Sequence, residues 1–391
     1  MRSQSPFLTI LLLWGSGLGA AAQFGKISVL FDMIAIHYPG ASTVSLGLML
    51  SISGIVGVGF GTMAGLLVQG LGYRRVLVAA LAGGAVLSAL EALLPPLPLM
   101  LLLRIGEGLS HLAIVVAVPV LIAQLAPQKH QSLAMTLWSS FFSISFAFTA
   151  FLGLPFAEAH GVGAVFLFHA GYMGLFAVIM LAALPRDGQI TLPSLDPRDL
   201  LRRHGQIYAS PNLGAPALGF FFYTVIYIAV LTFFPPLIGG EWQGVVAITM
   251  PLVSIAVSLT LGVALMHRYP AFRVVQGGFA LVALVAIPLW FFWGTEVVMF
   301  LGAFLLAAIL GVVQGASFAT VPQLNPGMEE RAQASGALAQ IGNLGIAVGT
   351  PILAFMLTNL GGQGLALFVL LPSLIGICVH ESMARRRARW A

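Results

Sequence analysis

Twelve long apolar runs make up most of the chain, and short polar connections separate them. A bilayer core about 30 Å thick requires about 20 residues of α-helix to cross it. Backbone polar groups in lipid must be paired within the protein, which favours helices. Because the runs are long and show no short alternating strands, the sequence predicts an all-α integral membrane protein. The expected transmembrane helices lie at residues 7–35, 43–68, 76–94, 99–125, 133–157, 164–184, 212–238, 244–266, 274–293, 297–322, 332–358 and 364–380.

The basic residues indicate how these helices are oriented. All but two of the 17 Lys and Arg residues fall on the side of the membrane that carries both chain ends, and the opposite loops contain none. The positive-inside rule makes that side cytoplasmic. We therefore expect a protein of the cell (cytoplasmic, inner) membrane with both termini in the cytoplasm. The basic positions on this side are Arg2, Arg74, Arg75, Lys129, Arg186, Arg198, Arg202, Arg203, Arg268, Arg273, Arg331, Arg385, Arg386, Arg387 and Arg389.

Composition excludes several classes of protein. Only 7% of the residues are charged, whereas a soluble domain typically carries about 25%. The net charge of +5 is spread over short loops, so we expect no nucleic-acid partner. Cys378 is the only cysteine, and no His, Cys or Asp residues have metal-ligand spacing. The chain also lacks a phosphate-binding loop and a nucleophile elbow. We expect no metal, no cofactor and no enzymatic activity.

A long polar connection, residues 185–211, lies in the middle of the chain. Within it, Asp196 stands at a favourable N-cap position and Pro197 at the first helical position, while Arg202 and Arg203 follow where a last turn would lie. This pattern predicts a short cytoplasmic helix inside a linker.

The linker divides the chain into two expected six-helix halves, residues 1–184 and residues 212–391, the second ending in a basic tail. Weak internal repeats at a spacing of about half the chain support a duplicated unit. The matching pairs are Gly65 with Gly262, Arg75 with Arg273, and Gln124-Leu125-Ala126-Pro127 with Gln323-Leu324-Asn325-Pro326. The expected fold is therefore two pseudo-symmetric halves of six transmembrane helices each.

The connection between the second and third helices resembles a loop of the major facilitator superfamily, G-x-x-x-D-x-x-G-R-R. This chain has the glycines and arginines of that loop but Gln in place of Asp; the matching residues are Gly65, Gln69, Gly72, Arg74 and Arg75. The resemblance implies the superfamily fold, and it implies that this loop gates the cytoplasmic side. The neutral Gln69 is at odds with a purely ionic latch.

Two further motifs bear on the resemblance. The fourth helix carries Arg104-Ile105-Gly106-Glu107-Gly108, which resembles the R-x-x-q-G pattern of proton-coupled members with Glu in the Gln position. The helix-5 Gly-Pro signature of drug/proton antiporters is absent, which disfavours drug efflux. In the superfamily, the first, fourth, seventh and tenth helices line a central cavity.

Charges inside the membrane are the strongest site candidates, because each costs roughly 2.5–3.5 kcal/mol on insertion scales. Arg104, Glu107 and His111 fall on one face of the fourth helix. In one interpretation Arg104 binds an anionic group of a solute, and Glu107 or His111 exchanges a proton. In the other, Arg104 and Glu107 form an ion pair that only stabilises the helix bundle.

The first helix contributes Lys26, with Gln23 one turn earlier and Asp32 near its outer end. The resemblance places these residues in the same space as the fourth-helix charges. Each buried charge needs a partner. Pairing of Lys26 with Glu107 and of Asp32 with Arg104 is plausible, but the sequence does not choose between ion pairs and ligand contacts, and Asp32 also fits a solvated position.

The corresponding helices of the second half carry no full charges but offer polar and aromatic side chains: Tyr223, Tyr227, Gln314 and Ser317. Charge in the first half together with these groups in the second suits a small amphipathic or zwitterionic solute. The alternative is that each group forms a helix–helix hydrogen bond.

Together these observations predict a secondary transporter that moves a small polar or charged organic solute by alternating access. We expect it to be a monomer in the lipid bilayer, coupled to protons or another ion. The alternatives are an efflux antiporter for drugs or metabolites, a membrane sensor that does not transport, and a lipid-modifying membrane enzyme.

Overall fold

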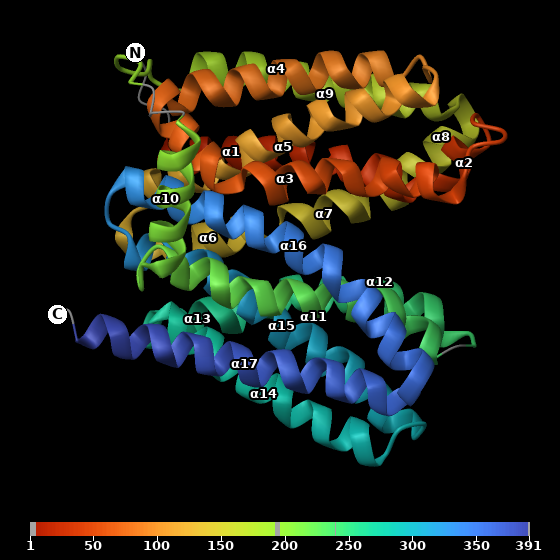
Figure 1. Ribbon diagram of the computed structural model, residues 1–391. Coiled ribbons are helices and arrows are strands. Elements are labelled where there is room, and N and C mark those ends of the chain that lie inside the picture. Colours follow the sequence, from red (N-terminus) through yellow and green to blue (C-terminus); the bar gives the residue numbers. More distant parts are fainter. Residues whose placement is uncertain (1–4, 192–195, 239, 390–391) are drawn as a thin grey trace. The chain divides into compact units, whose positions relative to one another are not determined.

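The computed structural model describes residues 5–191, 196–238 and 240–389, and this part of the chain contains helices and no strands (Figure 1). Twelve of its segments are long and apolar enough to cross a membrane, and each overlaps one of the predicted runs. Arg2 and residues 192–195 of the predicted linker lie outside the described residues. The spans are Pro6–Val29, Ser45–Leu71, Tyr73–Glu91, Leu97–Leu125, Gln128–His160, Val162–Ala183, Gly214–Ile238, Trp242–Arg268, Ala271–Phe291, Glu296–Leu324, Met328–Leu360 and Gly362–Ala388.

The helices form two compact units. The first unit contains the described residues up to Gln128 and from Ser140 to Leu200. Its helices are α1 (Pro6–Val29), α2 (Phe31–Ala35), α3 (Thr43–Leu71), α4 (Tyr73–Glu91), α5 (Leu97–Leu125), α7 (Phe141–Phe148), α8 (Leu154–His160) and α9 (Val162–Ala183).

The second unit contains residues Lys129–Ser139 and the described residues from Leu201 onward. Its helices are α6 (Gln131–Ser139), most of α10 (Pro197–Ala209), α11 (Gly214–Ile238), α12 (Trp242–Val257), α13 (Val263–Arg268), α14 (Ala271–Phe291), α15 (Glu296–Leu324), α16 (Met328–Leu360) and α17 (Gly362–Ala388).

The two units repeat one packing scheme. In the first unit α5 packs against α3 and α4, and α4 also packs against α9. In the second unit α15 packs against α12 and α14 in the same way, and α14 packs against α17. The sequence repeat follows this scheme, because α5 ends one residue before Ala126 and α15 ends one residue before Asn325. The predicted fold of twelve helices in two pseudo-symmetric sets is confirmed.

Two predicted helices differ from the structure. The run 7–35 is broken at Leu30, so α1 ends at Val29 and the five residues of α2 form a separate helix. The run 133–157 is divided into α6, α7, a π-helical turn at Thr149–Gly153 and α8, and α6 belongs to the second unit. Apolar length predicts that a segment crosses the membrane, but it carries no information about breaks within the segment.

The central linker contains the helix α10, which begins after Asp196. The Asp196 carboxylate accepts a hydrogen bond from the Arg198 N–H at 2.8 Å, as an N-cap residue does. The helix continues to Ala209, so Arg202 and Arg203 lie in its middle and not in its last turn. Tyr208, near its end, donates a hydrogen bond to Gln340 of α16 at 2.8 Å, which ties α10 to the second unit.

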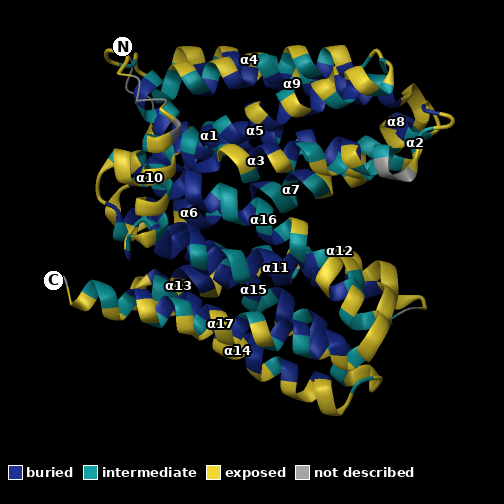
Figure 2. Ribbon diagram, viewed as in Figure 1, coloured by how far each residue is buried: buried dark blue, intermediate teal, exposed yellow. Residues whose placement is uncertain are grey.

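Buried and exposed residues alternate around each helix (Figure 2). Large apolar side chains such as Phe151, Phe168 and Phe291 are more than two-thirds exposed. Exposed apolar surface of this kind on apolar helices suits contact with lipid chains. Inside the second unit, Gly345 and Gly349 face the α11 backbone, where an added Cβ would collide with the carbonyl groups of Phe221 and Val225. Close helix packing within this unit accounts for their four-residue spacing.

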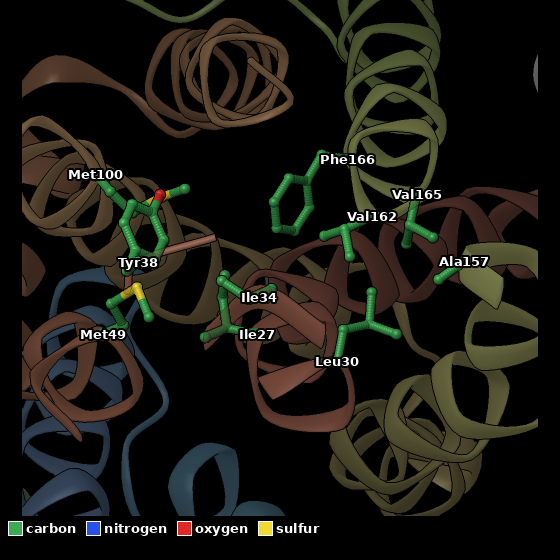
Figure 3. Packing of buried hydrophobic residues seen from close by; sticks show 10 residues of the cluster. All are labelled: Ile27, Leu30, Ile34, Tyr38, Met49, Met100, Ala157, Val162, Val165 and Phe166. Carbon is green, nitrogen blue, oxygen red and sulfur yellow. The ribbon is translucent and has the colours of Figure 1, made fainter. Parts of the chain in front are cut away.

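An apolar cluster in the first unit joins residues of α1, α2, α3, α5, α8 and α9 (Figure 3). Ile27, Leu30 and Ile34 lie between Tyr38 and its neighbours on one side and the start of α9 on the other. The cluster consists of Ile27, Leu30, Ile34, Tyr38, Met49, Met100, Ala157, Val162, Val165 and Phe166. Because Lys26 directly precedes Ile27, this apolar layer borders the charged residues of the first unit.

Candidate functional site

Four charged side chains of the first unit meet inside the protein, and we call them the charge cluster: Lys26 of α1, Glu91 of α4, and Arg104 and Glu107 of α5. None is more than 1% exposed. The Lys26 Nζ atom lies 2.7 Å from Glu91 Oε2 and 2.7 Å from Glu107 Oε1. Arg104 Nη1 pairs with Glu107 Oε2 and lies 4.0 Å from Glu91 Oε1. Two cations and two carboxylates thus share one site.

Local structure explains how these residues come together. Lys26 lies in the last turn of α1, where a cation is favoured by the helix dipole. Glu91 is the last residue of α4, and Arg104 and Glu107 are three residues apart on one face of α5. Because α5 packs against both α1 and α4, the three helices bring their charges to one point.

The Arg104 guanidinium is held by backbone carbonyls as well as by Glu107. Nη1 donates to the Gln23 carbonyl at 2.7 Å, and Nε donates to the Met49 carbonyl at 3.1 Å. The second terminal nitrogen, Nη2, is buried, and no described residue accepts a hydrogen bond from it. Arg104 therefore retains an N–H₂ group that can bind one further acceptor.

The Lys26 ammonium has polar partners beyond the carboxylates. It donates to Ser88 Oγ at 2.7 Å, and Ser88 in turn donates to the Phe166 carbonyl at 3.0 Å. His169 Nδ1 lies 3.4 Å from Lys26 Nζ, and the Phe166 ring centroid lies 4.8 Å from it. These contacts fix the position of the ammonium group.

Electrostatics require the cluster to be balanced. Removing a single ion from water costs several kcal/mol, and a buried pair recovers that cost only with good geometry and satisfied hydrogen bonds. Here the two positive charges of Lys26 and Arg104 are offset by the two negative charges of Glu91 and Glu107, so the ionised cluster is neutral. Because the ionised cluster has no net charge, its four ionisable groups can be buried within membrane-spanning helices.

The other predicted residues of the first unit occupy different positions. Gln23 Nε2 donates to Ser110 at 3.0 Å, and its carbonyl group accepts from Arg104, so Gln23 borders the cluster. The His111 ring bonds the Ala20 carbonyl through Nδ1 at 2.9 Å and packs edge-on against Phe24. His111 is thus joined to the α1 backbone and not to Glu107.

Of the alternatives left open for Asp32, the structure shows the solvated position and not a pairing with Arg104. Asp32 lies on α2, beyond the break at Leu30, and its side chain is exposed. Arg104 is paired with Glu107, whereas the expected contact between Lys26 and Glu107 is present.

In the second unit, Tyr223 and Tyr227 stack on each other with ring centroids 5.1 Å apart. Tyr223 is 2% exposed, and its hydroxyl has no hydrogen-bond partner among the residues that the structure describes. Gln314 donates to the Ser139 carbonyl at 2.9 Å, and Ser317 donates to the Val313 carbonyl of its own helix at 2.7 Å. Gln314 and Ser317 therefore make the structural hydrogen bonds of the alternative interpretation.

Sequence reasoning missed three residues of this site: Glu91, Ser88 and His169. Glu91 lies near the end of an apolar run, where an acidic residue is easily assigned to a solvated turn. One signal could have identified it. Lys26 and Arg104 are two intramembrane cations, and Glu107 alone leaves one of them without a balancing charge.

The predicted gating loop is held by a carboxylate from another part of the chain. Asp187, which follows α9, accepts hydrogen bonds from the N–H groups of Arg74 and Arg75 at 3.1 and 2.8 Å. Gly72 has φ +98°, and a Cβ there would collide with the Asp187 carboxyl group. The N-terminus of α4 thus obtains its acidic cap from Asp187, while the family's Asp position holds the half-buried Gln69.

Replacing this cap should lower stability. We expect Asp187→Ala to reduce the free energy of unfolding by about 0.5–2 kcal/mol, because two N–H groups at the start of α4 lose their acceptor. Thermal unfolding of the purified protein in detergent measures the change. Gln189→Ala, two residues further along the same exposed segment, serves as the control. Equal unfolding temperatures for the two variants would contradict a capping role.

Twelve spans, a duplicated unit and buried intramembrane charges define a polytopic membrane protein of the transporter type. The sequence profile of the Major Facilitator Superfamily matches residues 12–350, and the chain belongs to this family. The comparison with curated proteins gives no significant sequence match.

Solved structures with a similar fold are transporters of the same superfamily. The human organic anion transporter MFSD10 (TETRAN) aligns over 97% of this chain and 100% of its own, with a TM-score of 0.78 and 18% identity. The E. coli fucose:proton symporter FucP covers 98% and 99%, with a TM-score of 0.76 and 15% identity. The proton:xylose symporter XylE covers 98% and 96%, with a TM-score of 0.76 and 14% identity. At these identities the similarity establishes the fold alone.

Proposed function

We propose that this protein is a secondary transporter that moves a small polar or charged organic solute across the membrane by alternating access, coupled to protons. The observation that carries the proposal is the charge cluster, in which Arg104 Nη2 is buried without an acceptor among the described residues. A guanidinium group with a free N–H₂ edge is suited to a carboxylate or another anionic group. Intramembrane ionisable residues commonly mark solute and proton pathways.

The comparisons support this proposal at the level of class. FucP and XylE are described as proton symporters, and MFSD10 as an organic anion transporter. The cluster contains both elements that such transport requires: a cation that can bind an anionic group, and carboxylates that can take up a proton. Within the second unit, Tyr223 offers a buried hydroxyl as a candidate solute contact, whereas Tyr227, Gln314 and Ser317 have weaker support in this role.

A substrate screen in proteoliposomes tests the function. Purified protein is reconstituted, a pH gradient is imposed, and accumulation of anionic, zwitterionic and neutral organic solutes is measured. We expect accumulation of a solute that carries an anionic group, and we expect a protonophore to abolish it. Arg104→Lys keeps the positive charge but removes the forked donor, so it should weaken solute binding. Solute accumulation that does not depend on the imposed pH gradient would contradict proton coupling.

We further propose that the protein lies in the inner membrane as a monomer, with both termini and residues 185–211 in the cytoplasm. Support comes from the one-sided distribution of Lys and Arg. On this orientation the loop that contains Gly65, Gln69 and Gly72 is the cytoplasmic gating loop, and Asp187 caps the start of α4 beside it.

Reporter fusions test the orientation. A reporter attached after Leu200 should be cytoplasmic, and one attached after Glu241 should be external, because exactly one span, Gly214–Ile238, separates the two points. Paired reporters that are active on opposite sides of the membrane measure this directly. The same location for both fusions would contradict the proposed arrangement.

A further inference from the structure

We propose that Glu91 is the carboxylate that takes up and releases the coupled proton, an inference that rests on the proton-coupled transport proposed above. From the sequence, this role falls to Glu107 or His111. The geometry of the charge cluster points to Glu91, which lies on a different helix, at the end of α4.

The two carboxylates of the cluster are not equivalent. Glu107 accepts hydrogen bonds at both oxygens, from Lys26 at Oε1 and from Arg104 at Oε2. Glu91 has one close cationic partner, Lys26 Nζ at 2.7 Å from Oε2, whereas its other oxygen, Oε1, lies 4.0 Å from Arg104 Nη1. Hydrogen bonds to the charged form stabilise that form. The charge of Glu91 is therefore the less compensated of the two.

The position of Glu91 on its helix acts in the same direction. Glu91 is the C-terminal residue of α4, where the helix dipole disfavours a negative charge. Glu107 lies within α5 and is not exposed to this terminal effect. Both the contacts and the helix position thus identify Glu91 as the carboxylate whose protonation costs less free energy than that of Glu107.

The ionisable groups around Glu91 are held in other contacts, so we assign the exchange of the coupled proton to Glu91. His169 of α9 donates its Nε2 N–H to the Gly19 carbonyl at 2.9 Å, and its Nδ1 lies 2.9 Å from Ser88 Oγ and 3.4 Å from Lys26 Nζ, whose positive charge opposes a second proton on the ring. Tyr38, between α2 and α3, donates to the Pro95 carbonyl at 2.9 Å, and burial together with the charge of Glu91 raises the pKa of Tyr38. The remaining charged groups facing Glu91 are Lys26 of α1 and Arg104 and Glu107 of α5.

Protonation of Glu91 changes the charge of the cluster. The proton adds to a carboxylate oxygen, no other bond is broken, and Lys26 keeps its hydrogen bonds to Glu107 and Ser88. The neutral cluster then carries one net positive charge. That charge strengthens binding of an anionic group at Arg104, and by linkage the bound anion strengthens proton binding. Proton uptake and solute binding are coupled in this way without a rearrangement of Glu107.

Infrared difference spectroscopy of the purified protein in lipid tests the assignment without a substrate. Lowering the pH should produce the C=O band of a buried, weakly hydrogen-bonded carboxylic acid. The band should be absent in Glu91→Gln and present in Glu158→Gln, which removes an exposed carboxyl group of α8. A band that persists in Glu91→Gln would overturn the proposal.

A second variant covers the case in which Glu91→Gln does not fold. Glu91→Asp keeps a titratable carboxyl group but shortens it by one methylene, so the band should shift in frequency. An unshifted band in Glu91→Asp would assign the proton to another carboxyl group and would also overturn the proposal.

Transport separates failure of this inference from failure of the proposed function. In proteoliposomes, Glu91→Gln should lose proton-driven accumulation by about tenfold or more, equivalent to about 1.4 kcal/mol, while exchange of solute across the membrane continues. Wild-type accumulation in Glu91→Gln would remove Glu91 as the coupling residue. If the wild-type protein transports no solute, the proposed transport function is wrong. The infrared band still decides whether Glu91 binds the proton.

Discussion

Glu107→Leu is expected to prevent accumulation of folded protein, and the double variant Arg104→Met, Glu107→Leu is expected to restore it. The single change leaves Arg104 buried without its closest anion and gives the charge cluster a net positive charge. Breaking a buried ion pair in this way costs about 3–5 kcal/mol. In the double variant the remaining Lys26–Glu91 pair, 2.7 Å apart, is neutral. Apolar replacement of a whole buried pair is often neutral or stabilising.

Expression, size-exclusion chromatography and thermal unfolding measure the folding of the two variants, and proteoliposome flux measures their function. Because Arg104 provides the proposed donor to the solute, the double variant should fold but not transport. Wild-type flux in the double variant would show that the pair only stabilises the bundle. A stable, monodisperse Glu107→Leu would contradict the energetic account of the cluster.

Gly311→Val is expected to destabilise the second unit. Gly311 of α15 faces the backbone of α12, where an added Cβ would collide with the Ser254 carbonyl group. A backbone carbonyl cannot rotate away as a flexible side chain can, so the two helices must separate. Overpacking typically costs about 1–3 kcal/mol of the free energy of unfolding and occasionally more. Because two helix backbones must separate here, we expect a cost at the upper end of this range.

Gly277→Val is the matched control, because a Cβ at this exposed position of α14 meets no atom within 4 Å. Both variants make the same change within a helix, so intrinsic helix propensity cancels in the comparison. Unfolding temperatures in detergent measure the difference. If Gly277→Val is destabilised as much as Gly311→Val, the close approach of α12 and α15 does not explain the effect.

The spans were predictable because crossing a membrane is a local property of the chain. A run of about 20 apolar residues is sufficient to predict a transmembrane helix, and all twelve runs contain one. The repeat of Gln124 and Gln323 also marked equivalent helix ends. The breaks at Leu30 and Thr149–Gly153 were not predictable, since the apolar length of a run carries no information about breaks within it.

The candidate site was predicted in part. Lys26, Arg104 and Glu107 stand out as charges in apolar runs, and the Lys26–Glu107 contact was one of the pairings considered. Glu91 was missed because it lies near the end of the run 76–94, where an acidic residue is easily assigned to a solvated turn.

The sequence by itself determined the class of protein, the twelve helices and their duplication. Apolar length and repeats are properties of the linear sequence and do not depend on how the helices pack. The tertiary structure alone decided which charges meet. Lys26, Glu91 and Arg104 lie on three helices, and the rotation and depth of each helix depend on packing against its neighbours. A buried charge demands a partner, but only the packing of α1, α4 and α5 selects which one.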